Sequence, residues 1–443
     1  MKRSFSATGA ALLAASVLLA ACNNDTGSTA LPGDDHDHDH GHEHGESAGR
    51  LVFTHADGAN SRVYVHDLES GETIADFALV HPATAVYASP ESRYAVILQR
   101  DNDQVEFLDN GIHLHDDHAH EDAPAMLGFT LAGVAPTHYR VNGEHAALYF
   151  DGDDGAGQMS RFELFSDESL EAGGVLAAQT LDTAHHGVAE PLEGLVLASH
   201  TATSGDAPDG VTVFELHGDH FHDEGELGTA CPGLHGAATS GLYTVFGCQD
   251  GALLAELHGD HFHAHKIATP ERLATVLGHP DVAQLAAFSY PGDTLYVIDP
   301  EAETATETDW RDGAVDSGGD PVSAVARAFD AHGEHLLILD GEGDLHVLET
   351  ADWSHRGSVS LLDDVPAAGP APALAVSAAA EQAFVTDPAA QALHVLDLES
   401  LSVETVDLDF APTGLAWTGI GGEHDHGEGE EGHDHDDEND HEH

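Results

Sequence analysis

The stretch Pro-Thr-His-Tyr-Arg-Val-Asn-Gly-Glu-His-Ala-Ala-Leu-Tyr-Phe, residues 136–150, contains the pattern that decides the fold of this chain. A Pro-led run, Pro136–Val141, is followed by a short turn and by a second apolar run, Ala146–Phe150. Short runs rich in β-branched or aromatic residues and separated by turn clusters are typical of β-strands. No long helical period appears between Arg50 and Ile420, so the pattern predicts an all-β fold.

The same order of runs recurs along the chain. First runs lie near Thr84–Ala88, Pro136–Val141, His186–Glu190, His235–Ser240, Leu273–Leu277, Val322–Ala326 and Ala373–Ser377. Second runs follow at Tyr94–Leu98, Ala146–Phe150, Leu195–Ser199, Leu242–Gly247, Leu285–Ser289, His335–Leu339 and Ala383–Thr386. The spacing is about 40 to 50 residues, the length of one blade of a β-propeller.

The two ends of the repeat region indicate how the ring closes. The first repeat, which begins at Leu51–Thr54, is one strand short, and a lone run, Pro412–Trp417, remains after the last repeat. If this run completes the first blade, the ring closes and no sheet edge is left open. We therefore predict a single β-propeller of eight blades over residues 50–420. Seven blades would result if one long repeat had been divided in two, and a pair of β-sandwiches is the structural alternative.

The composition is strongly acidic. The 443 residues contain 13 Lys and Arg against 80 Asp and Glu, a formal net charge of −67. Such a field repels nucleic acid and anionic membrane surfaces and attracts cations and basic partners. A salt-rich habitat, in which screening removes the self-repulsion, would also explain the charge. Neither a G-x-S-x-G elbow, a P-loop nor an H-E-x-x-H helix motif is present.

The N-terminal segment, residues 1–22, is typical of a lipoprotein signal peptide. Lys2 and Arg3 precede an apolar run from Ala10 to Ala21, which ends at Cys22. The sequence Leu-Ala-Ala-Cys at 19–22 resembles a bacterial lipobox, which implies diacylation of Cys22 and a lipid-anchored protein of the periplasm or cell envelope. Asn23 after the cysteine points to the outer membrane. The alternative is a plain secretory signal with a chance cysteine.

Three histidines share one phase of the repeat. His138, His186 and His235 each lie ten positions before the centre of an apolar run, at Leu148, Val196 and Val245 respectively. Equal phase in neighbouring blades predicts that the three imidazoles meet at one mouth of the central channel, where they can bind Zn²⁺. Alternatively, they line a solvated channel and bond to the backbone. His185 would point the other way along an extended strand.

A tetrahedral zinc site needs a fourth ligand, which a carboxylate, another histidine or water can supply. The loops after the second strands open at the same mouth and carry the candidates. These are Asp101 or Asp103, Asp151 and His200. Of these, we predict Asp101 and His200 as members of the metal site.

Two histidine hairpins repeat one another. Glu-Leu-His-Gly-Asp-His-Phe-His at 215–222 recurs at 256–263, and a Gly-Asp turn in each predicts a hairpin near a blade rim. Alternation places two histidines of each outer strand on one face, and a third hairpin is also rich in histidine. We predict weak metal binding at His113, His115, His118, His120, His220, His222, His261 and His263. The alternative is hydrophilic decoration that blocks strand addition.

Both ends of the chain are rich in histidine, aspartate and glutamate. Residues 23–49 and 421–443 cannot bury a core, so we predict disordered tails. They offer many weak metal sites that raise the local metal concentration, or they are solvated charge tails. The tail residues concerned are His36, His38, His40, His42, His44, His424, His426, His433 and His435.

Beyond Cys22 the chain has two cysteines, Cys231 and Cys248. In an exported protein such a pair most often forms a disulfide. The alternative is a pair of thiolate zinc ligands beside His235.

Taken together, these features resemble the periplasmic zinc metallochaperones of the AztD type. The resemblance rests on the signal peptide, the His/Asp tail, the propeller, Cys-Pro-Gly-Leu-His-Gly at 231–236 and the duplicated His-Gly-Asp-His-Phe-His hairpins. It implies a non-catalytic protein, expected to be a monomer, that binds zinc at a histidine-built site and hands it to the solute-binding protein of an ABC-type zinc importer. The lipobox departs from this pattern, because a tethered chaperone must meet its partner at a membrane. A metal-dependent propeller hydrolase or lactonase, or a metal-buffering surface lipoprotein, are the alternatives.

Overall fold

The computed structural model describes residues 48–421 apart from residues 59, 116–117, 260, 364 and 366–368, and for His115 and His118 it describes the backbone alone. The signal peptide, Cys22 and the predicted metal residues of the two tails lie outside the described residues. These tail residues are His36, His38, His40, His42, His44, His424, His426, His433 and His435. In the described part of the chain, no helix has the length and apolar character needed to cross a bilayer.

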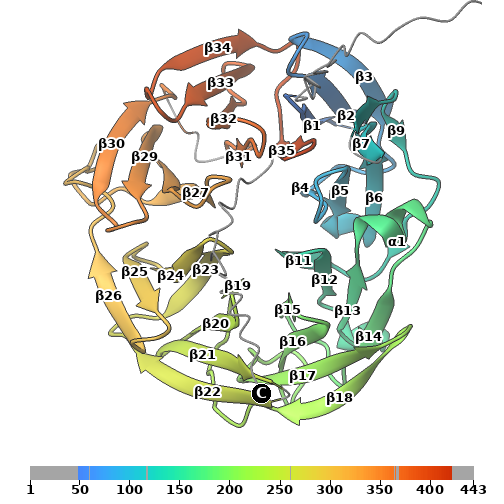
Figure 1. Cartoon of the computed structure of the whole chain (residues 1–443), viewed down its shortest axis with the longest axis vertical. Coiled ribbons are helices and arrows are strands. Elements are labelled where there is room, and N and C mark those ends of the chain that lie inside the picture. Colours follow the sequence, from blue (N-terminus) through green and yellow to red (C-terminus); the bar gives the residue numbers. More distant parts are fainter. Residues whose placement is uncertain are drawn as a thin grey trace, which may run out of the picture. The chain divides into compact units, whose positions relative to one another are not determined.

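Eight antiparallel sheets form the blades of a β-propeller (Figure 1). The first blade contains β1 (Arg50–Asp57), β2 (Asn60–Asp67), β3 (Glu72–Ala78) and β35 (Gly414–Thr418). The second contains β4 (Ala85–Ala88), β5 (Tyr94–Gln99), β6 (Gln104–Asp109), β9 (Ala125–Met126) and β10 (Leu131–Ala132). The third contains β11 (Pro136–Asn142), β12 (His145–Phe150), β13 (Arg161–Phe165) and β14 (Ala177–Thr180). The fourth contains β15 (Ala189–Leu192), β16 (Leu195–His200), β17 (Gly210–His217) and β18 (His220–Glu226).

The remaining blades follow the same order, from the channel to the rim. The fifth contains β19 (Ala237–Ser240), β20 (Tyr243–Cys248), β21 (Gly251–His258) and β22 (His261–Ala268). The sixth contains β23 (Leu273–His279), β24 (Val282–Ser289), β25 (Leu295–Asp299) and β26 (Thr304–Thr308). The seventh contains β27 (Ala324–Phe329), β28 (His335–Asp340), β29 (Asp344–Glu349) and β30 (His355–Ser360). The eighth contains β31 (Leu374–Val376), β32 (Gln382–Asp387), β33 (Ala392–Asp397) and β34 (Val403–Asp407).

Little regular structure lies outside the blades. A separate two-stranded hairpin consists of β7 (Ile112–His115) and β8 (His118–Glu121), inserted after β6. The helical segments are η1 (Arg100–Asn102), η2 (Asp154–Ala156) and α1 (Asp167–Glu171). The prediction of an all-β propeller is therefore confirmed, and the count is eight blades rather than seven.

Closure of the ring occurs as the orphan strand predicted. The innermost strand of the first blade is β35, which pairs antiparallel with β1 so that Leu51 faces Trp417 and Phe53 faces Leu415. The N- and C-terminal parts of the repeat region thus share one sheet. This pairing leaves the first blade with four strands and removes the open edge that an eight-blade ring would otherwise have.

The second strand of each blade is apolar on both faces because it is covered by the blades on either side. The strand β5, Tyr-Ala-Val-Ile-Leu-Gln, is buried at every position, whereas the rim strand β34 is mostly exposed. Between the second and third blades, Phe107, Phe150 and Phe165 belong to one buried cluster. This interblade packing fixes the inner strands, and with them the side chains at the channel.

Candidate metal centre

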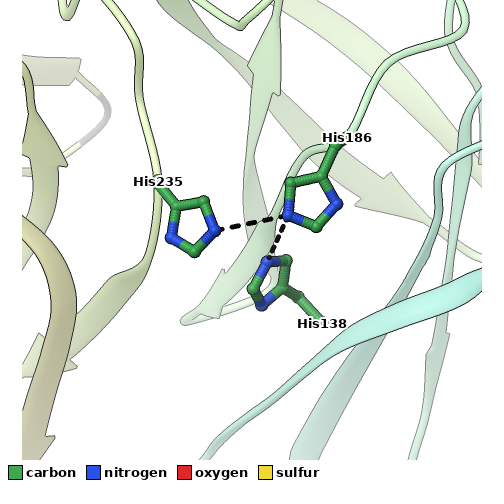
Figure 2. A group of neighbouring side chains, drawn as sticks. All are labelled: His138, His186 and His235. Carbon is green, nitrogen blue, oxygen red and sulfur yellow. Dashed lines mark hydrogen bonds between the residues drawn. The ribbon is translucent and has the colours of Figure 1, made fainter. Parts of the chain in front are cut away.

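The three predicted histidines converge at the inner ends of three consecutive blades. His138 lies in β11, His186 lies before β15, and His235 lies before β19. Their ligating nitrogens lie within 4.8 Å of one another. His138 Nε2 is 3.3 Å from His186 Nε2, and His186 Nε2 is 3.3 Å from His235 Nε2 (Figure 2).

The three residues do not occupy equivalent strand positions, contrary to the equal phase that the sequence indicated. His138 is the third residue of β11, whereas His186 and His235 precede their strands by three and two residues. In β11 the register shifts between Pro136 and Tyr139, so that Thr137 and His138 oppose the single residue Tyr149. A β-bulge of this kind re-aims a side chain locally, which explains how an in-strand histidine meets two loop histidines.

The loop that carries His235 is held at several points. Cys231 and Cys248 form a disulfide, so they are not a pair of free thiolates. The backbone N–H of His235 donates to the carbonyl of Gly247 at 2.9 Å. Gly236 has φ +76°, and a Cβ there would collide with the carbonyl oxygen of Ala274. Only glycine therefore allows the chain to turn directly after His235.

The same carbonyl of Ala274 orients the His235 ring. His235 Nδ1 lies 2.9 Å from that oxygen. A carbonyl can only accept a hydrogen bond, so Nδ1 carries the proton and the lone pair of the neutral ring is at Nε2. The side chain therefore presents a metal-binding nitrogen toward His186.

A carboxylate orients His186 in the same way. Asp151 Oδ2 lies 3.0 Å from His186 Nδ1 and 2.7 Å from Arg100 Nη2. Burial raises the pKa of Asp151, but the hydrogen bonds from His186 and Arg100 outweigh burial, and the pKa lies below its usual value. The ionised carboxylate accepts the Nδ1 proton, which leaves the lone pair at His186 Nε2. Metal-binding histidines commonly have such a partner on their other nitrogen.

These two orientations create an electrostatic problem that a cation resolves. With both Nδ1 atoms protonated, the neutral rings of His186 and His235 point two lone pairs at each other across 3.3 Å. Neither can donate to the other, so a proton or a metal ion is needed between them. A tetrahedral zinc ion with Zn–N bonds of about 2.0–2.1 Å separates its ligand nitrogens by about 3.3–3.4 Å. The two measured separations of 3.3 Å match this value.

The protonation equilibria also favour neutral rings. Burial lowers the pKa of His138 well below its usual value, with further contributions from Arg140, His186 and His235. Burial likewise lowers the pKa of His235. Both imidazoles are therefore neutral at neutral pH, the state in which they can bind a metal ion.

The two further residues that the sequence suggested are not brought to this cluster. Asp101 lies in η1 and is exposed, and Asp103 accepts from the backbone N–H of Ala135. His200 contacts Thr212 and lies 3.6 Å from Glu226, at the other end of its blade from a cluster ligand. These side chains point to blade-internal partners because the loops after the second strands fold back onto their own blades. Asp151 alone among the candidates reaches the histidines, as an orienting group.

The neighbour of His186 faces the core, as alternation predicted. His185 is buried, and its Nε2 lies 2.8 Å from Tyr149 Oη and 3.1 Å from the carbonyl of Ser199. It therefore packs between blades and takes no part in the cluster. Arg100 and the carbonyl of Ala274 are the functional groups that sequence reasoning missed, because neither an isolated arginine nor a backbone carbonyl carries a recognisable motif.

A second group in the described part of the chain could also hold an ion by distance alone, namely Asp330, His335 and Glu381. Its chemistry differs. His335 Nδ1 lies 2.7 Å from Asp330 Oδ2, and His335 Nε2 lies 2.5 Å from Arg356 Nη1. Because a guanidinium only donates, the second nitrogen accepts, and both nitrogens are used inside the blade. We assign this group to the packing of the seventh blade.

The rim histidines lie on hairpins, as predicted. In β17–β18 His217 pairs with His220, and in β21–β22 His258 pairs with His261. In β7–β8 His113 pairs with His120, and their rings stack with centroids 5.8 Å apart. The side chains of His115 and His118 lie outside the described part of the structure.

Fold and site together define a β-propeller with a preorganised three-histidine centre suited to one late divalent metal ion. No family model matches the sequence. The chain is 28% identical over 384 residues to the zinc chaperone AztD of Citrobacter koseri, an alignment that covers 82% of this chain and 86% of the relative. The resemblance to the AztD type inferred from the sequence is thereby confirmed.

Solved structures agree on the fold. The structure of apo AztD from Citrobacter koseri superposes with a TM-score of 0.70 at 22% identity, covering 84% of this chain and 98% of that one. A second crystal structure of Citrobacter koseri AztD gives a TM-score of 0.70 at 23% identity, covering 85% and 99%. The dihydro-heme d1 dehydrogenase NirN gives 0.55 at 13% identity, covering 83% and 75%. Because an enzyme shares the architecture, the fold alone does not define the function.

Proposed function

We propose that this chain is a zinc metallochaperone of the cell envelope, which acquires zinc at His138, His186 and His235 and delivers it to the solute-binding protein of an ABC-type zinc importer. The observation that carries the proposal is the confrontation of the two lone pairs of His186 and His235 at 3.3 Å. An imidazole pair that is oriented in this way by Asp151 and Ala274 is poised for a cation. The similarity to a zinc chaperone supports zinc as that cation.

The accessibility of the centre suits transfer rather than permanent storage. The side chain of His186 is 46% exposed, while the Asp151 that orients it is 10% exposed. Three imidazoles leave the fourth tetrahedral position open on the solvent side. A donor atom of an acceptor protein can enter there, so the zinc ion can pass between proteins without being released as a free ion.

The remaining parts of the proposal concern segments beyond the described residues. The signal peptide and the lipobox at Cys22 support export and anchoring by a lipid in the cell envelope, with the outer membrane as the expected site. The histidine-rich tails support a role in acquisition, because many weak sites raise the local zinc concentration near the centre. Nothing in this mechanism requires more than one copy of the chain.

The test is a competitive zinc titration of the full chain against a strong chelator, which reports the tightest site only. We expect one tight site in the native protein and in the His200→Gln variant. We expect it to be lost in His186→Ala. Transfer is then followed by mixing zinc-loaded protein with the apo form of an importer's solute-binding protein in the presence of excess chelator. Transfer no faster than chelator capture would contradict direct delivery.

A metal-dependent hydrolase is the second candidate, because an open fourth position can also activate water. Against it, the carboxylate that contacts the cluster, Asp151, is bound to both His186 and Arg100 and is not free to act as a general base. Turnover of a lactone or phosphoester panel, abolished in His186→Ala and retained in His200→Gln, would favour the enzyme. A surface lipoprotein that only buffers metal would bind zinc without any transfer.

A further inference from the structure

The duplicated hairpins of the fourth and fifth blades carry matched histidine clusters on their outer faces. In β17–β18, Leu216 and Phe221 pack toward the interblade core. The alternation of the strands therefore turns Glu215, His217, His220 and His222 to the other face. In β21–β22 the corresponding outward residues are Glu256, His258, His261 and His263.

The two clusters have nearly the same geometry. His220 Nε2 and His222 Nε2 are 3.2 Å apart, and His261 Nε2 and His263 Nε2 are 3.2 Å apart. The third imidazole stacks on this pair in each case, with ring centroids 4.3 Å apart for His217 and His222. The equivalent centroids of His258 and His263 are 4.6 Å apart. Both pairs of nitrogens approach the separation of about 3.3–3.4 Å that a tetrahedral zinc ion imposes.

A glutamate sets the orientation of the third imidazole in each cluster. His217 Nε2 is 2.8 Å from Glu215 Oε2, and His258 Nε2 is 2.9 Å from Glu256 Oε2. A carboxylate accepts, so Nε2 carries the proton and the lone pair of the neutral ring lies at Nδ1. This is the same arrangement by which Asp151 orients His186 at the channel. A small rotation of the exposed ring brings this lone pair to the adjacent pair of nitrogens.

The field between the two hairpins is negative. A cavity of about 570 Å³ lies between them and is lined by residues of both. Its acidic residues are Glu193, Glu215, Glu224 and Glu226, and His261 lines it from the other hairpin. Carboxylates that share a cavity concentrate cations beside the imidazoles.

We infer that these hairpins are a pair of equivalent binding sites for late divalent metal ions, each formed by three imidazoles with one glutamate orienting the third. The sites are separate from the three-histidine centre, and the inference does not depend on delivery of zinc to a partner. A contact between two imidazoles can also be a simple hydrogen bond, in which one ring donates to the other. The repetition of the whole arrangement in two blades, carboxylate included, is what favours a metal site. Zinc, nickel and copper all suit imidazole ligands.

The sites are solvent-exposed and need a ring rotation, so they bind more weakly than the channel centre. The experiment is diethyl pyrocarbonate labelling of the full chain at buffered free zinc concentrations, with mass spectrometry resolving each histidine peptide. The reagent modifies unliganded imidazole nitrogens. Zinc should protect His220 and His222 at the same concentration as His261 and His263, and above the concentration that protects His186. His145, at the start of β12, is the control whose labelling should not change.

The decisive variants alter one hairpin and leave the other as its matched control. His217→Ala should raise the zinc concentration for half-protection of His220 and His222 by about tenfold or more, a loss of about 1.4 kcal/mol. Glu215→Gln should produce a shift in the same direction. Protection of His261 and His263 should be unchanged in both variants, and His258→Ala should give the reverse pattern.

Two outcomes would overturn the inference. The first is unchanged labelling of all four outer-strand histidines at zinc concentrations that protect the terminal segments. The second is identical protection in the native protein and in His217→Ala, which would exclude the three-imidazole set. Because His186 is followed in the same samples, failure at the channel with protection at the rim would count against the proposed function alone.

Discussion

The orientation of His186 by Asp151 gives the sharpest prediction. In Asp151→Asn the hydrogen bond to Nδ1 can be retained by the amide oxygen, but the negative charge is lost. The carboxylate oxygen lies 3.0 Å from Nδ1, so a metal ion bound at Nε2 would lie roughly 7 Å from that charge once the ring and a Zn–N bond are added. At an effective dielectric constant between 80 and 20, the attraction of a divalent ion to the carboxylate is about 1 to 5 kcal/mol.

Arg100 pushes the effect in the same direction, because its guanidinium keeps its charge after the carboxylate has been neutralised. We therefore expect a zinc dissociation constant that is about 10 to 100 times higher, the usual result of removing an orienting partner. Asp151→Ala should cost more, since it also frees the ring to rotate. The assay is competition of the full chain with a strong chelator.

A matched control is available in the second blade. Asp109 accepts from Arg93 at 2.9 Å and is about as shielded from solvent as Asp151, but it does not contact the three histidines. Asp109→Asn should leave zinc affinity unchanged. The reasoning would be refuted if both substitutions at Asp151 left the affinity unchanged while His186→Ala abolished binding. It would also be refuted if Asp109→Asn weakened zinc binding as much as Asp151→Asn.

Three further predictions concern the supports of the centre. Replacing Cys231 and Cys248 by serine removes a cross-link with a sequence separation of 17 and should lower the free energy of unfolding in urea by about 3 kcal/mol, together with zinc affinity, because the loop carries His235; unchanged stability would contradict this. Gly236→Ala should weaken zinc binding in the chelator assay while the far-ultraviolet circular dichroism stays native, since a Cβ would displace the loop from Ala274; native affinity would show that the close approach is dispensable. Burial raises the pKa of Glu190 from 4.5 to about 7, so the folded state binds this proton more tightly than the unfolded state, and the group should lower stability by roughly 3 kcal/mol as pH rises from 4.5 to 7. In Glu190→Gln, urea unfolding should show a correspondingly smaller decline across that range, and an identical decline would contradict the assignment.

Most of the fold could be predicted because each blade repeats one local pattern. The alternation of apolar runs and turns identified every blade, and the orphan strand at Pro412–Trp417 identified the closure with β1. These features are written in short segments, where periodicity and burial coincide. The convergence of His138, His186 and His235 also followed from their spacing in the repeat, although two of them proved to lie in loops before their strands.

The partners of the histidines were harder to predict because they depend on loop conformation. Asp101 and Asp151 both follow a second strand, and sequence alone could not decide which of them turns toward the channel. Asp151 does so because Arg100 of the preceding blade reaches across and binds it at 2.7 Å. Likewise, the orientation of His235 depends on the backbone of Ala274 in the next blade, for which no side-chain signal exists.

The fixed orientation of the rings has a consequence for release. When zinc leaves, the two lone pairs of His186 and His235 face each other again at 3.3 Å, and the apo state is raised in energy. Spontaneous loss is therefore disfavoured at neutral pH, where lowered pKa values keep His138 and His235 unprotonated. An acceptor overcomes this by entering the open position beside His186 and competing for the ion while it is still bound. The geometry that holds zinc tightly is thus also one that favours transfer through a shared intermediate over release into solution.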